Sequence, residues 1–382
     1  MKKWVFLSCV LAALLLAAGF LPLVAPDLPE NAPVVPAAVD RAGVYYRENA
    51  VATAAAADIV MEQSGYVLSA GNENVRLGMA STTKIMTALL AIELLEPEAV
   101  VTVPKEAVGI EGSSIYLIEG EQITVSDLLY GLMLESGNDA ATALAIAAGG
   151  TVEHFVAMMN ERAAELGLED THFSNPHGLS ADDHYTTAYD LARLTCAALE
   201  NETFAEIVSC KTKTISDGKR YLSNHNRLLR SYEGCIGVKT GYTIATGRTL
   251  VTAAERDGLT LVAVTLNDRS DWADHTKLLD YGFANYESVA LEGVSDMPLP
   301  VVGGIAESVS VSAPDGNVVL PKGQTVTRRL VMPQFIYAPV EAGDVLGYAE
   351  YYCNGERIAV EPLTAVSSVE VRRLSFWERL FG

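Results

Sequence analysis

The stretch ASTTKIMTALLAIELL at residues 80–95 begins with small and hydroxylated side chains, continues with a lysine and then runs almost entirely apolar. The apolar run predicts a buried helix. Ser81 and Lys84 form an S-x-x-K motif, and this spacing places both side chains on one face of the helix, one turn apart. Either Ser81 caps the helix while Lys84 extends its ammonium group to solvent, or Ser81 is a nucleophile and Lys84 is the base that removes its proton.

The S-x-x-K motif alone does not distinguish these interpretations. Ser216 and Lys219 form a second S-x-x-K motif, SDGK, whose composition predicts a turn. A lysine can act as a base only where burial or a neighbouring cation lowers its pKa. Taken by itself, Ser81 is therefore better interpreted as a helix cap, and a catalytic role depends on what the rest of the chain supplies.

The composition predicts a globular protein. The chain has 382 residues, of which 49% are hydrophobic and 20% charged, and this length is enough for two domains with their own cores. Its formal net charge of −21 argues against a nucleic-acid partner, because binding to phosphates requires a basic surface.

The N-terminus has the layout of a secretory signal peptide. Lys2 and Lys3 precede an apolar stretch over residues 4–20, and small residues and a proline-rich segment follow. We therefore expect a signal peptide at residues 1–25 and a protein that works outside the cytoplasm; an uncleaved anchor is the alternative, because the stretch is almost long enough to span a bilayer. The cysteines beyond it are widely spaced and form no C-x-x-C pair, which predicts neither a disulfide scaffold nor a zinc knuckle.

Residues 26–56 are rich in proline and alanine and are expected to be a linker. Residues 57–287 are predicted to form a mixed domain with strands at both ends and helices between them. Its expected elements are hairpins around residues 63–65 and through Asp257-Gly258, helices over residues 80–95, up to Glu135, up to Gly149 and over residues 151–168, a strand at residues 235–243, and a closing helix at residues 274–287.

Residues 288–370 are predicted to form a small all-β domain. Val309 and Val311 alternate with serines, as in a half-buried strand, and Asp315-Gly316 and Asn354-Gly355 each lie between β-like runs. The whole chain is therefore expected to be an α+β protein with a second, smaller β domain.

The tail at residues 371–382, VRRLSFWERLFG, is amphipathic if it is helical. Leu374, Trp377 and Phe381 would then share one face, with Phe376 and Leu380 beside it. Such a helix could lie in a membrane interface, where four or five large apolar side chains contributing about 1.5–3 kcal/mol each would bind reversibly. The residues alone favour this interpretation equally with a tail that is frayed or packed on the protein.

Two further motifs each occur once in the chain. S-G-N at residues 136–138 interrupts two predicted helices; such a break can direct a hydroxyl and an amide into a cleft, although these residues are also common in ordinary turns. K-T-G at residues 239–241 lies on the strand candidate. There a lysine and a threonine suit an anionic group and the glycine admits a substrate backbone, whereas a solvated strand end is the alternative.

In the order S-x-x-K, S-x-N and K-T-G, the three motifs are far more specific than any one of them. The sequence resembles the low-molecular-weight penicillin-binding proteins, the serine-type D-alanyl-D-alanine carboxypeptidases of bacterial cell walls. The resemblance implies a β-lactamase/transpeptidase-like catalytic domain, with an antiparallel sheet flanked by helices, followed by a small β domain. It extends over about residues 50–382 and includes NPHGL at 175–179, TTAYDLARL at 186–194, NHNRLL at 224–229 and KTGYT at 239–243.

The resemblance also implies a role for each motif. Ser81 would attack the penultimate D-Ala carbonyl of a peptidoglycan pentapeptide stem and form an acyl-enzyme, and Lys84 would accept its proton. Ser136 would relay that proton to the leaving D-Ala, while Asn138 would hold the substrate amide. Water would then release the shortened peptide, a step in cell-wall maturation.

The third motif would bind the substrate. Lys239 and Thr240 would face its terminal carboxylate, Gly241 would admit its backbone, and the backbone N–H groups of Ser81 and Tyr242 would form the oxyanion hole. The resemblance implies no metal and no other cofactor. It also implies that β-lactams trap Ser81 and that the tail attaches the protein to the outer face of the cytoplasmic membrane.

Three alternatives belong to other classes. A class A β-lactamase shares the motifs but also needs an E-x-x-L-N stretch, which does not occur between Asn138 and Lys239. A catalytically inactive penicillin sensor is disfavoured, because no catalytic residue is missing. A metal-dependent hydrolase could use the segment HFSNPHGLSADDH, although its spacing matches no helical metal-binding motif. The candidate ligands in that segment are His172, His177, Asp182, Asp183 and His184.

Overall fold

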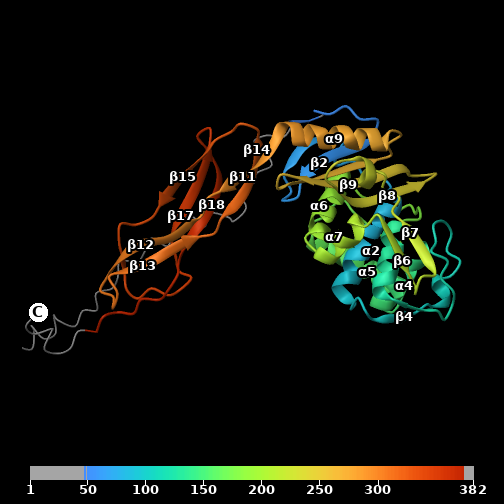
Figure 1. The fold of residues 1–382 in the computed structure, drawn as a ribbon, viewed down its shortest axis with the longest axis horizontal. Helices are drawn as coiled ribbons and strands as arrows, with labels where there is room; N and C mark the ends of the chain where they lie inside the picture. Colours follow the sequence, from blue (N-terminus) through green and yellow to red (C-terminus); the bar gives the residue numbers. More distant parts are fainter. Residues whose placement is uncertain (1–46, 49, 374–382) are drawn as a thin grey trace, which may run out of the picture. The chain divides into compact units, whose positions relative to one another are not determined.

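The computed structural model of the protein describes residues 47–48 and 50–373. The described chain divides into two compact units (Figure 1). The N-terminal unit contains the described chain up to Val289 together with Asn317–Gln324, and the β unit contains Ala290–Gly316 and the chain from Thr325 onward. The predicted signal peptide at residues 1–25 lies outside the described residues, as do most of the predicted linker and of the amphipathic tail.

A six-stranded sheet in the order β1-β3-β2-β10-β9-β8 runs through the N-terminal unit. Both predicted hairpins are confirmed: β2 (Ala57–Glu62) pairs antiparallel with β3 (Val67–Gly71), and β9 (Gly247–Arg256) pairs antiparallel with β10 (Leu259–Leu266). The predicted strand that carries K-T-G is β8 (Cys235–Thr243). It pairs with β9 and forms one edge of the sheet, so one side of its backbone has no neighbouring strand.

The opposite edge strand, β1 (Arg47–Glu48), pairs in parallel with β3. It lies within residues 26–56, which the composition predicts to be a linker, so the end of that segment belongs to the folded unit. Nearby, Thr53 Oγ1 donates to Asp58 Oδ2 and Ala54 N donates to Asp274 Oδ2, both at 2.6 Å. Composition does not reveal such pairing, because the strand has only two residues and its partner lies further along the chain.

Helices cover both faces of this sheet (Figure 1). Alternate residues of β2 point to opposite faces: Ile59 and Met61 join the larger core, whereas Val60 packs with α9 (Asp271–Asn285) in a second core. The other described helices are α2 (Lys84–Leu94), α3 (Val125–Leu134), α4 (Asn138–Gly149), α5 (Val152–Glu165), α6 (Ala188–Leu199), α7 (Glu202–Ser209) and α8 (Leu228–Ser231), with 3-10 turns η2 (Ala80–Thr83) and η3 (Lys105–Ala107).

Several helices begin where the sequence supplies a cap. The side chains of Thr124, Thr151 and Thr187 accept the N–H groups three residues further on, at the starts of α3, α5 and α6. The helices predicted over residues 80–95, up to Glu135, up to Gly149 and over residues 151–168 are confirmed as α2, α3, α4 and α5. The predicted closing helix at residues 274–287 is α9. In the part of the chain that the structure describes, no single helix is long and apolar enough to cross a membrane; α4 and α5 meet those criteria only together, with a bend of 84° between them.

Short two-stranded sheets complete the N-terminal unit. The second S-x-x-K motif lies in the turn between β6 and β7, where Lys219 N donates to Ser216 O at 3.1 Å, so the predicted turn is confirmed. The paired strands are β4 (Val100–Thr102) with β5 (Gln122–Thr124), β6 (Thr212–Ile215) with β7 (Arg220–Ser223), and β11 (Tyr286–Leu291) with β14 (Gly316–Pro321).

The β unit is built on a six-stranded sheet in the order β15-β17-β18-β13-β12-β16, which confirms the all-β prediction. Asn354-Gly355 is the turn between β17 and β18, whereas β14, which begins at Gly316, pairs with β11 and not with β13. A local turn signal cannot exclude a partner that is more distant in sequence. The strands of the sheet are β12 (Val294–Val302), β13 (Ser308–Ala313), β15 (Val326–Val331), β16 (Ile336–Tyr337), β17 (Val345–Cys353) and β18 (Glu356–Ala365).

Buried asparagines of the NHNRLL segment hold β8 in place. The Asn226 side chain is fully buried; its Nδ2 donates to Gly237 O at 2.7 Å and its Oδ1 accepts from Leu228 N at 3.0 Å. Asn224 Oδ1 accepts from Asn226 N at 2.9 Å, and Asn224 Nδ2 donates to Val208 O at 3.2 Å. These bonds fix the segment before β8, and with it the position of K-T-G.

Replacing Asn226 by alanine should lower the free energy of unfolding by about 3 kcal/mol, because the Gly237 carbonyl and the Leu228 N–H would be left buried without partners. Urea denaturation followed by circular dichroism measures the change. Asn74→Ala is the matched control: the exposed Asn74 amide donates to the Glu73 carboxylate, and its loss should change stability by less than about 0.5 kcal/mol. Similar small losses in both variants would contradict the anchoring role of Asn226.

Candidate active site

Ser81 lies in the 3-10 turn η2, directly before α2, and does not cap that helix. Thr83 occupies the N-cap position of α2, and no side chain makes a capping hydrogen bond there. Ala80 has a φ of +47°, a left-handed conformation that costs a residue with a side chain about 1–3 kcal/mol unless its surroundings hold it. The capping interpretation of Ser81 is therefore wrong, and the serine is presented from a strained turn that the surrounding structure fixes.

Lys84 is the first residue of α2, and its side chain is fully buried. Its Nζ donates to Ser81 Oγ at 3.0 Å, to Asn138 Oδ1 at 2.7 Å and to His177 O at 2.6 Å. These partners are a hydroxyl, an amide and a backbone carbonyl, all of them neutral. The lysine is thus hydrogen-bonded in the core and does not extend to solvent.

The surroundings of Lys84 favour its neutral form. Burial lowers the pKa of Lys84 well below its usual value, and the cation of Lys239 lowers it further, while Asp139 opposes them. A buried amine 3.0 Å from a hydroxyl is placed to accept the proton of that hydroxyl. The S-x-x-K pair therefore has the geometry and the electrostatics of a nucleophile and its base.

The S-G-N motif lies in the break between α3 and α4, next to Lys84. Ser136 has a φ of +63°, and its buried hydroxyl has no hydrogen-bond partner among the described residues. Asn138 is the first residue of α4; its N–H donates to Ser113 O at 2.7 Å and its Nδ2 donates to Glu111 O at 2.5 Å. Asn138 therefore joins Lys84 to the loop at residues 109–121.

Asp139 holds the same loop, and no sequence motif identifies it. Its buried carboxylate accepts from Ser114 Oγ at 2.6 Å and from the backbone N–H groups of Ile115 at 3.1 Å and Leu117 at 3.0 Å. The only sequence signal is an acidic residue in the first turn of a helix, where the helix dipole favours it. An ordinary cap would give the same signal, so this positioning role becomes visible only with the loop in place.

The K-T-G motif lies on the edge strand β8, close to Ser81. Lys239 is 2% exposed, and burial lowers the pKa of its ammonium group to about 7 against the opposing charge of Glu135. A Cβ at Gly241 would lie 3.0 Å from Ser81 N and 2.3 Å from Thr249 Oγ1. Only glycine fits this close approach between β8 and the turn that carries the nucleophile.

The NPHGL segment packs directly against η2. Gly178 has a φ of +89°, and a Cβ there would lie 1.9 Å from Ala80 O. The Asn175 Oδ1 accepts from Gly178 N at 2.7 Å, and Thr87 Oγ1 donates from α2 to Pro176 O at 2.6 Å. This segment also supplies the His177 carbonyl to Lys84, so it is part of the site and not a distant loop.

The histidines proposed as metal ligands have other bonds. His184 Nε2 lies 2.7 Å from Thr83 Oγ1 and its Nδ1 accepts from Ser174 N at 3.0 Å, while His177 Nδ1 accepts from Leu179 N at 3.3 Å. Burial lowers the pKa of both His177 and His184 to about 4, so both rings are neutral at physiological pH. Over residues 47–48 and 50–373, no group of three or more His, Cys, Asp or Glu side chains could hold a metal ion.

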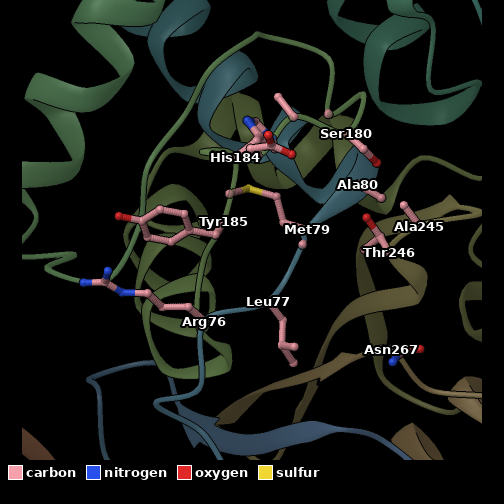
Figure 2. Close-up of a pocket in the computed structure, with 14 residues that line it drawn as sticks. Arg76, Leu77, Met79, Ala80, Ser180, His184, Tyr185, Ala245, Thr246 and Asn267 are labelled. Carbon is pink, nitrogen blue, oxygen red and sulfur yellow. The ribbon is translucent and has the colours of Figure 1, made fainter.

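A cavity of about 510 Å³ lies beside the turn that carries Ser81. Figure 2 shows its walls: residues 76–80 leading into η2, the loop at residues 178–185, the turn between β8 and β9, and Asn267. Ala80 borders this cavity, and Ser180 Oγ and Thr243 Oγ1 lie 3.0 Å apart between the loop and β8. The cavity thus begins one residue from the nucleophile, and its lining does not include Lys84 or Lys239.

The structure brings most of the predicted residues together. Ser81, Lys84 and Asn138 form one hydrogen-bonded group, Lys239 acts on Lys84 through its charge, and Gly241 contacts the Ser81 amide. Thr240 and Tyr242 lie on the same strand, with Thr240 half-buried and Tyr242 64% exposed. No hydrogen bond from either of these two side chains to the other motif residues is seen in the described chain.

Comparison with known families matches both units of the chain. A family model described as D-alanyl-D-alanine carboxypeptidase matches residues 45–270, and one described as the C-terminal domain of penicillin-binding protein 5 matches residues 296–371. The D-alanyl-D-alanine carboxypeptidase DacF of Bacillus subtilis is 33% identical over 349 residues, covering 86% of this chain and 89% of the relative. DacC of Escherichia coli is 35% identical over 329 residues, covering 80% and 82%.

Solved structures agree with these matches. Penicillin-binding protein 5 from Haemophilus influenzae has a TM-score of 0.73 with 31% sequence identity, covering 84% of this chain and 98% of that one. Penicillin-binding protein 6B from Escherichia coli has a TM-score of 0.67 with 30% identity, covering 82% and 96%. The similarity therefore extends over both units.

The two buried lysines predict a bell-shaped pH profile for acylation of Ser81 by benzylpenicillin. Below its lowered pKa, Lys84 is protonated and cannot accept the serine proton, so the rate constant should rise with pH. Above pH of about 7, Lys239 loses the charge that attracts the penicillin carboxylate, so the rate constant should fall again. Stopped-flow acylation at a series of pH values measures both limbs.

Lys239→Arg retains the cation at higher pH, because the pKa of a guanidinium group is well above that of an amine, and should move the falling limb to higher pH. Lys219→Arg, in the exposed turn between β6 and β7, is the matched control and should leave the profile unchanged. A falling limb that stays in place in Lys239→Arg would show that Lys239 is not its origin.

Proposed function

This chain belongs to the low-molecular-weight penicillin-binding proteins of the serine D-alanyl-D-alanine carboxypeptidase family, and from that membership we propose how its residues divide the reaction. The protein removes the terminal D-alanine from peptidoglycan stem peptides and is acylated by β-lactams. The observation that carries the assignment of roles is the fully buried Lys84, whose Nζ lies 3.0 Å from Ser81 Oγ and whose partners are all neutral.

Ser81 is the nucleophile and Lys84 is its base. The bond from Ser81 Oγ to the penultimate D-Ala carbonyl forms as the hydroxyl proton passes to the Lys84 amine. The negative charge that develops on the carbonyl oxygen is stabilised by the backbone N–H groups of Ser81 and Tyr242. Gly241 supports this role, because a side chain at that position would crowd the Ser81 amide, with a Cβ only 3.0 Å from Ser81 N.

Breaking the scissile C–N bond requires a proton on the departing amine, and Ser136 supplies the path. Its hydroxyl is buried without a partner among the described residues, so it is free to accept from Lys84 and donate to the leaving D-Ala. Asn138 holds Lys84 with its Oδ1 and a loop carbonyl with its Nδ2; its second amide hydrogen and second oxygen lone pair remain for the substrate amide. Water then attacks the acyl ester and regenerates Ser81.

The terminal carboxylate of the substrate binds at β8. Lys239 provides the positive charge and Thr240 a hydroxyl, and the unpaired edge of β8 can accept the substrate backbone as an added strand. The electrostatic effect of the Lys239 cation on Lys84 links the two motifs. A substrate carboxylate beside Lys239 partly cancels that cation, so binding would make the base stronger at the moment it is needed.

Ser81→Ala should reduce D-Ala release from a diacetyl-Lys-D-Ala-D-Ala tripeptide by at least about 10⁴-fold, because the acyl-enzyme can no longer form. Mass spectrometry should find the benzylpenicilloyl adduct on the peptide that contains Ser81 in the parent protein and on no peptide in the variant. Ser216→Ala, in the second S-x-x-K motif, is the control and should retain full activity and labelling. D-Ala release at the parent rate by Ser81→Ala would overturn the mechanism.

The protein acts at the outer face of the cytoplasmic membrane. Lys2, Lys3 and the apolar residues 4–20 support export, and the apolar side chains of the tail support attachment to lipid. Both segments lie outside the described residues, so this placement rests on their sequence.

The tail variant Trp377→Ser/Phe381→Ser should bind phosphatidylcholine/phosphatidylglycerol vesicles about a hundredfold more weakly than the parent, because two large apolar side chains no longer enter the interface. Vesicle flotation measures the affinity, and D-Ala release from the soluble tripeptide should not change. Arg379→Lys retains the tail's charge and apolar residues and serves as the matched control. Unchanged flotation of the Trp377→Ser/Phe381→Ser protein would exclude the tail as the attachment.

A further inference from the structure

The exposed apolar side chains of the β unit are gathered at one end of its sheet. Isolated exposed apolar residues are ordinary on a protein surface, whereas a group of them at one place indicates an interaction site. We call this group the apolar end. The large exposed hydrophobic residues described in the β unit are Val302, Ile305, Val331, Phe335, Tyr337, Val345, Val366 and Val371.

The strand connections place these residues at a common end. Val302 ends β12, Val331 ends β15 and Val345 begins β17. These termini lie at the same end of the sheet because the strands from β15 to β12 pair antiparallel with one another in turn. Ile305 lies in the connection from β12 to β13. Val371 extends the group, because Gly304 and Val371 form an isolated bridge.

The opposite end of the sheet has a different character. There Asn354-Gly355 turns β17 into β18, and the exposed residues around this turn are polar or charged, including Glu356 and Arg357. The difference between the two ends is therefore not a general property of strand termini in this unit.

An aromatic pair lies within the apolar end. Phe335 and Tyr337 stand edge to face, with ring centroids 5.6 Å apart and an interplanar angle of 87°. Both side chains are 47% exposed, and Ile305 is 66% exposed. Aromatic rings with this partial exposure are characteristic of the boundary between a membrane and water, where one part of the ring is apolar and the other is wet.

The described chain stops at this same end. Val371 pairs with Gly304, and the exposed Arg372 and Arg373 follow it directly (Figure 1). The next residues in the sequence are 374–382, with Leu, Phe, Trp, Leu and Phe among them. The apolar end and the apolar tail are thus continuous along the chain.

We propose that the apolar end of the β unit is itself a lipid-binding surface, which enters the membrane interface beside the tail. The inference rests on the membrane attachment proposed above and adds a folded surface to it. The ends of the six strands span about 24 Å, whereas residues 374–382 would cover only about 14 Å as a helix. A membrane plane can cover the whole group, whereas a helix of nine residues is too short to do so.

The charges around the apolar end favour insertion over electrostatic attraction. The exposed acidic residues Glu307, Glu341, Asp344 and Glu370 accompany Arg372 and Arg373. Because the acidic residues outnumber the arginines, this end of the β unit is only weakly attracted to an anionic membrane surface. Binding through the apolar end should therefore persist on purely zwitterionic vesicles.

The test compares full-chain variants that keep the tail intact. Ile305→Ser/Phe335→Ser/Tyr337→Ser should bind phosphatidylcholine vesicles about a hundredfold more weakly than the parent. The matched control is Leu94→Ser/Val100→Ser/Tyr221→Ser, which removes comparable exposed apolar side chains from the N-terminal unit and should bind like the parent. D-Ala release from the soluble tripeptide should be unchanged in both.

A second measurement does not depend on a loss of vesicle binding. In a Trp377→Phe background, which keeps the tail apolar and removes its own tryptophan, a tryptophan introduced as Phe335→Trp should be quenched by vesicles of brominated phosphatidylcholine, whereas one introduced as Tyr221→Trp should not. Quenching at position 335 supports the proposal, and equal fluorescence at both positions in the vesicle-bound protein overturns it.

The outcomes separate this inference from the tail attachment. Parent-like vesicle binding by the Ile305/Phe335/Tyr337 variant overturns the proposal that the apolar end binds lipid. This holds even if the tail variant Trp377→Ser/Phe381→Ser loses binding, a result that would support attachment through the tail. Loss of binding in both variants supports both surfaces. A parent protein that is dimeric on size exclusion and becomes monomeric only in the Ile305/Phe335/Tyr337 variant assigns the surface to a second copy of the chain and also overturns the proposal.

Discussion

The burial of the Lys84 amine among neutral acceptors is the constraint on which the rest of the site depends. Taking an ammonium group out of water without a carboxylate partner is costly, and the neutral form of the amine avoids most of that cost. The amine is therefore held by hydrogen bonds to a hydroxyl, an amide oxygen and a backbone carbonyl. Those acceptors come from η2, α4 and the segment before residue 178, so three distant parts of the chain must converge for one side chain to act as a base.

The close approaches around η2 are the packing that makes this convergence possible. Gly241 on β8 and Gly178 in the NPHGL segment contact the Ala80–Ser81 backbone from two directions, and a Cβ at either position would collide with it. The apolar run after Lys84 packs α2 into the larger core and prevents the lysine from turning outward. Asn226 and Asp139 then hold the strand and the loop that border the site. The close packing around η2 is therefore what holds the Lys84 amine beside the Ser81 hydroxyl.

Local patterns predicted the elements whose partners are close in sequence. The hairpins at residues 63–65 and Asp257-Gly258, the helices up to Glu135 and over residues 151–168, and the strand at residues 235–243 follow from periodicity and turn residues. The pairing of β1 with β3 and of β14 with β11 does not follow from local patterns. Which distant segments pair depends on which strand edges are still free once the neighbouring strands have formed. The role of Asp139 was hidden for the same reason: its partners are backbone groups of a loop more than 20 residues earlier.

The sequence by itself determined which chemical groups are available: a serine and a lysine one turn apart, a serine and an asparagine in a helix break, and a lysine, threonine and glycine on a strand, in an order typical of one enzyme family. The S-x-x-K spacing alone could not decide between Ser81 and Ser216, and it was the order of the three motifs that favoured Ser81. Only the tertiary structure supplied the physical difference between the two lysines, because it buried Lys84 beside α4 and the NPHGL segment and left Lys219 in an exposed turn. A pKa depends on solvent exclusion and on charges brought near by folding, and neither is a property of local sequence.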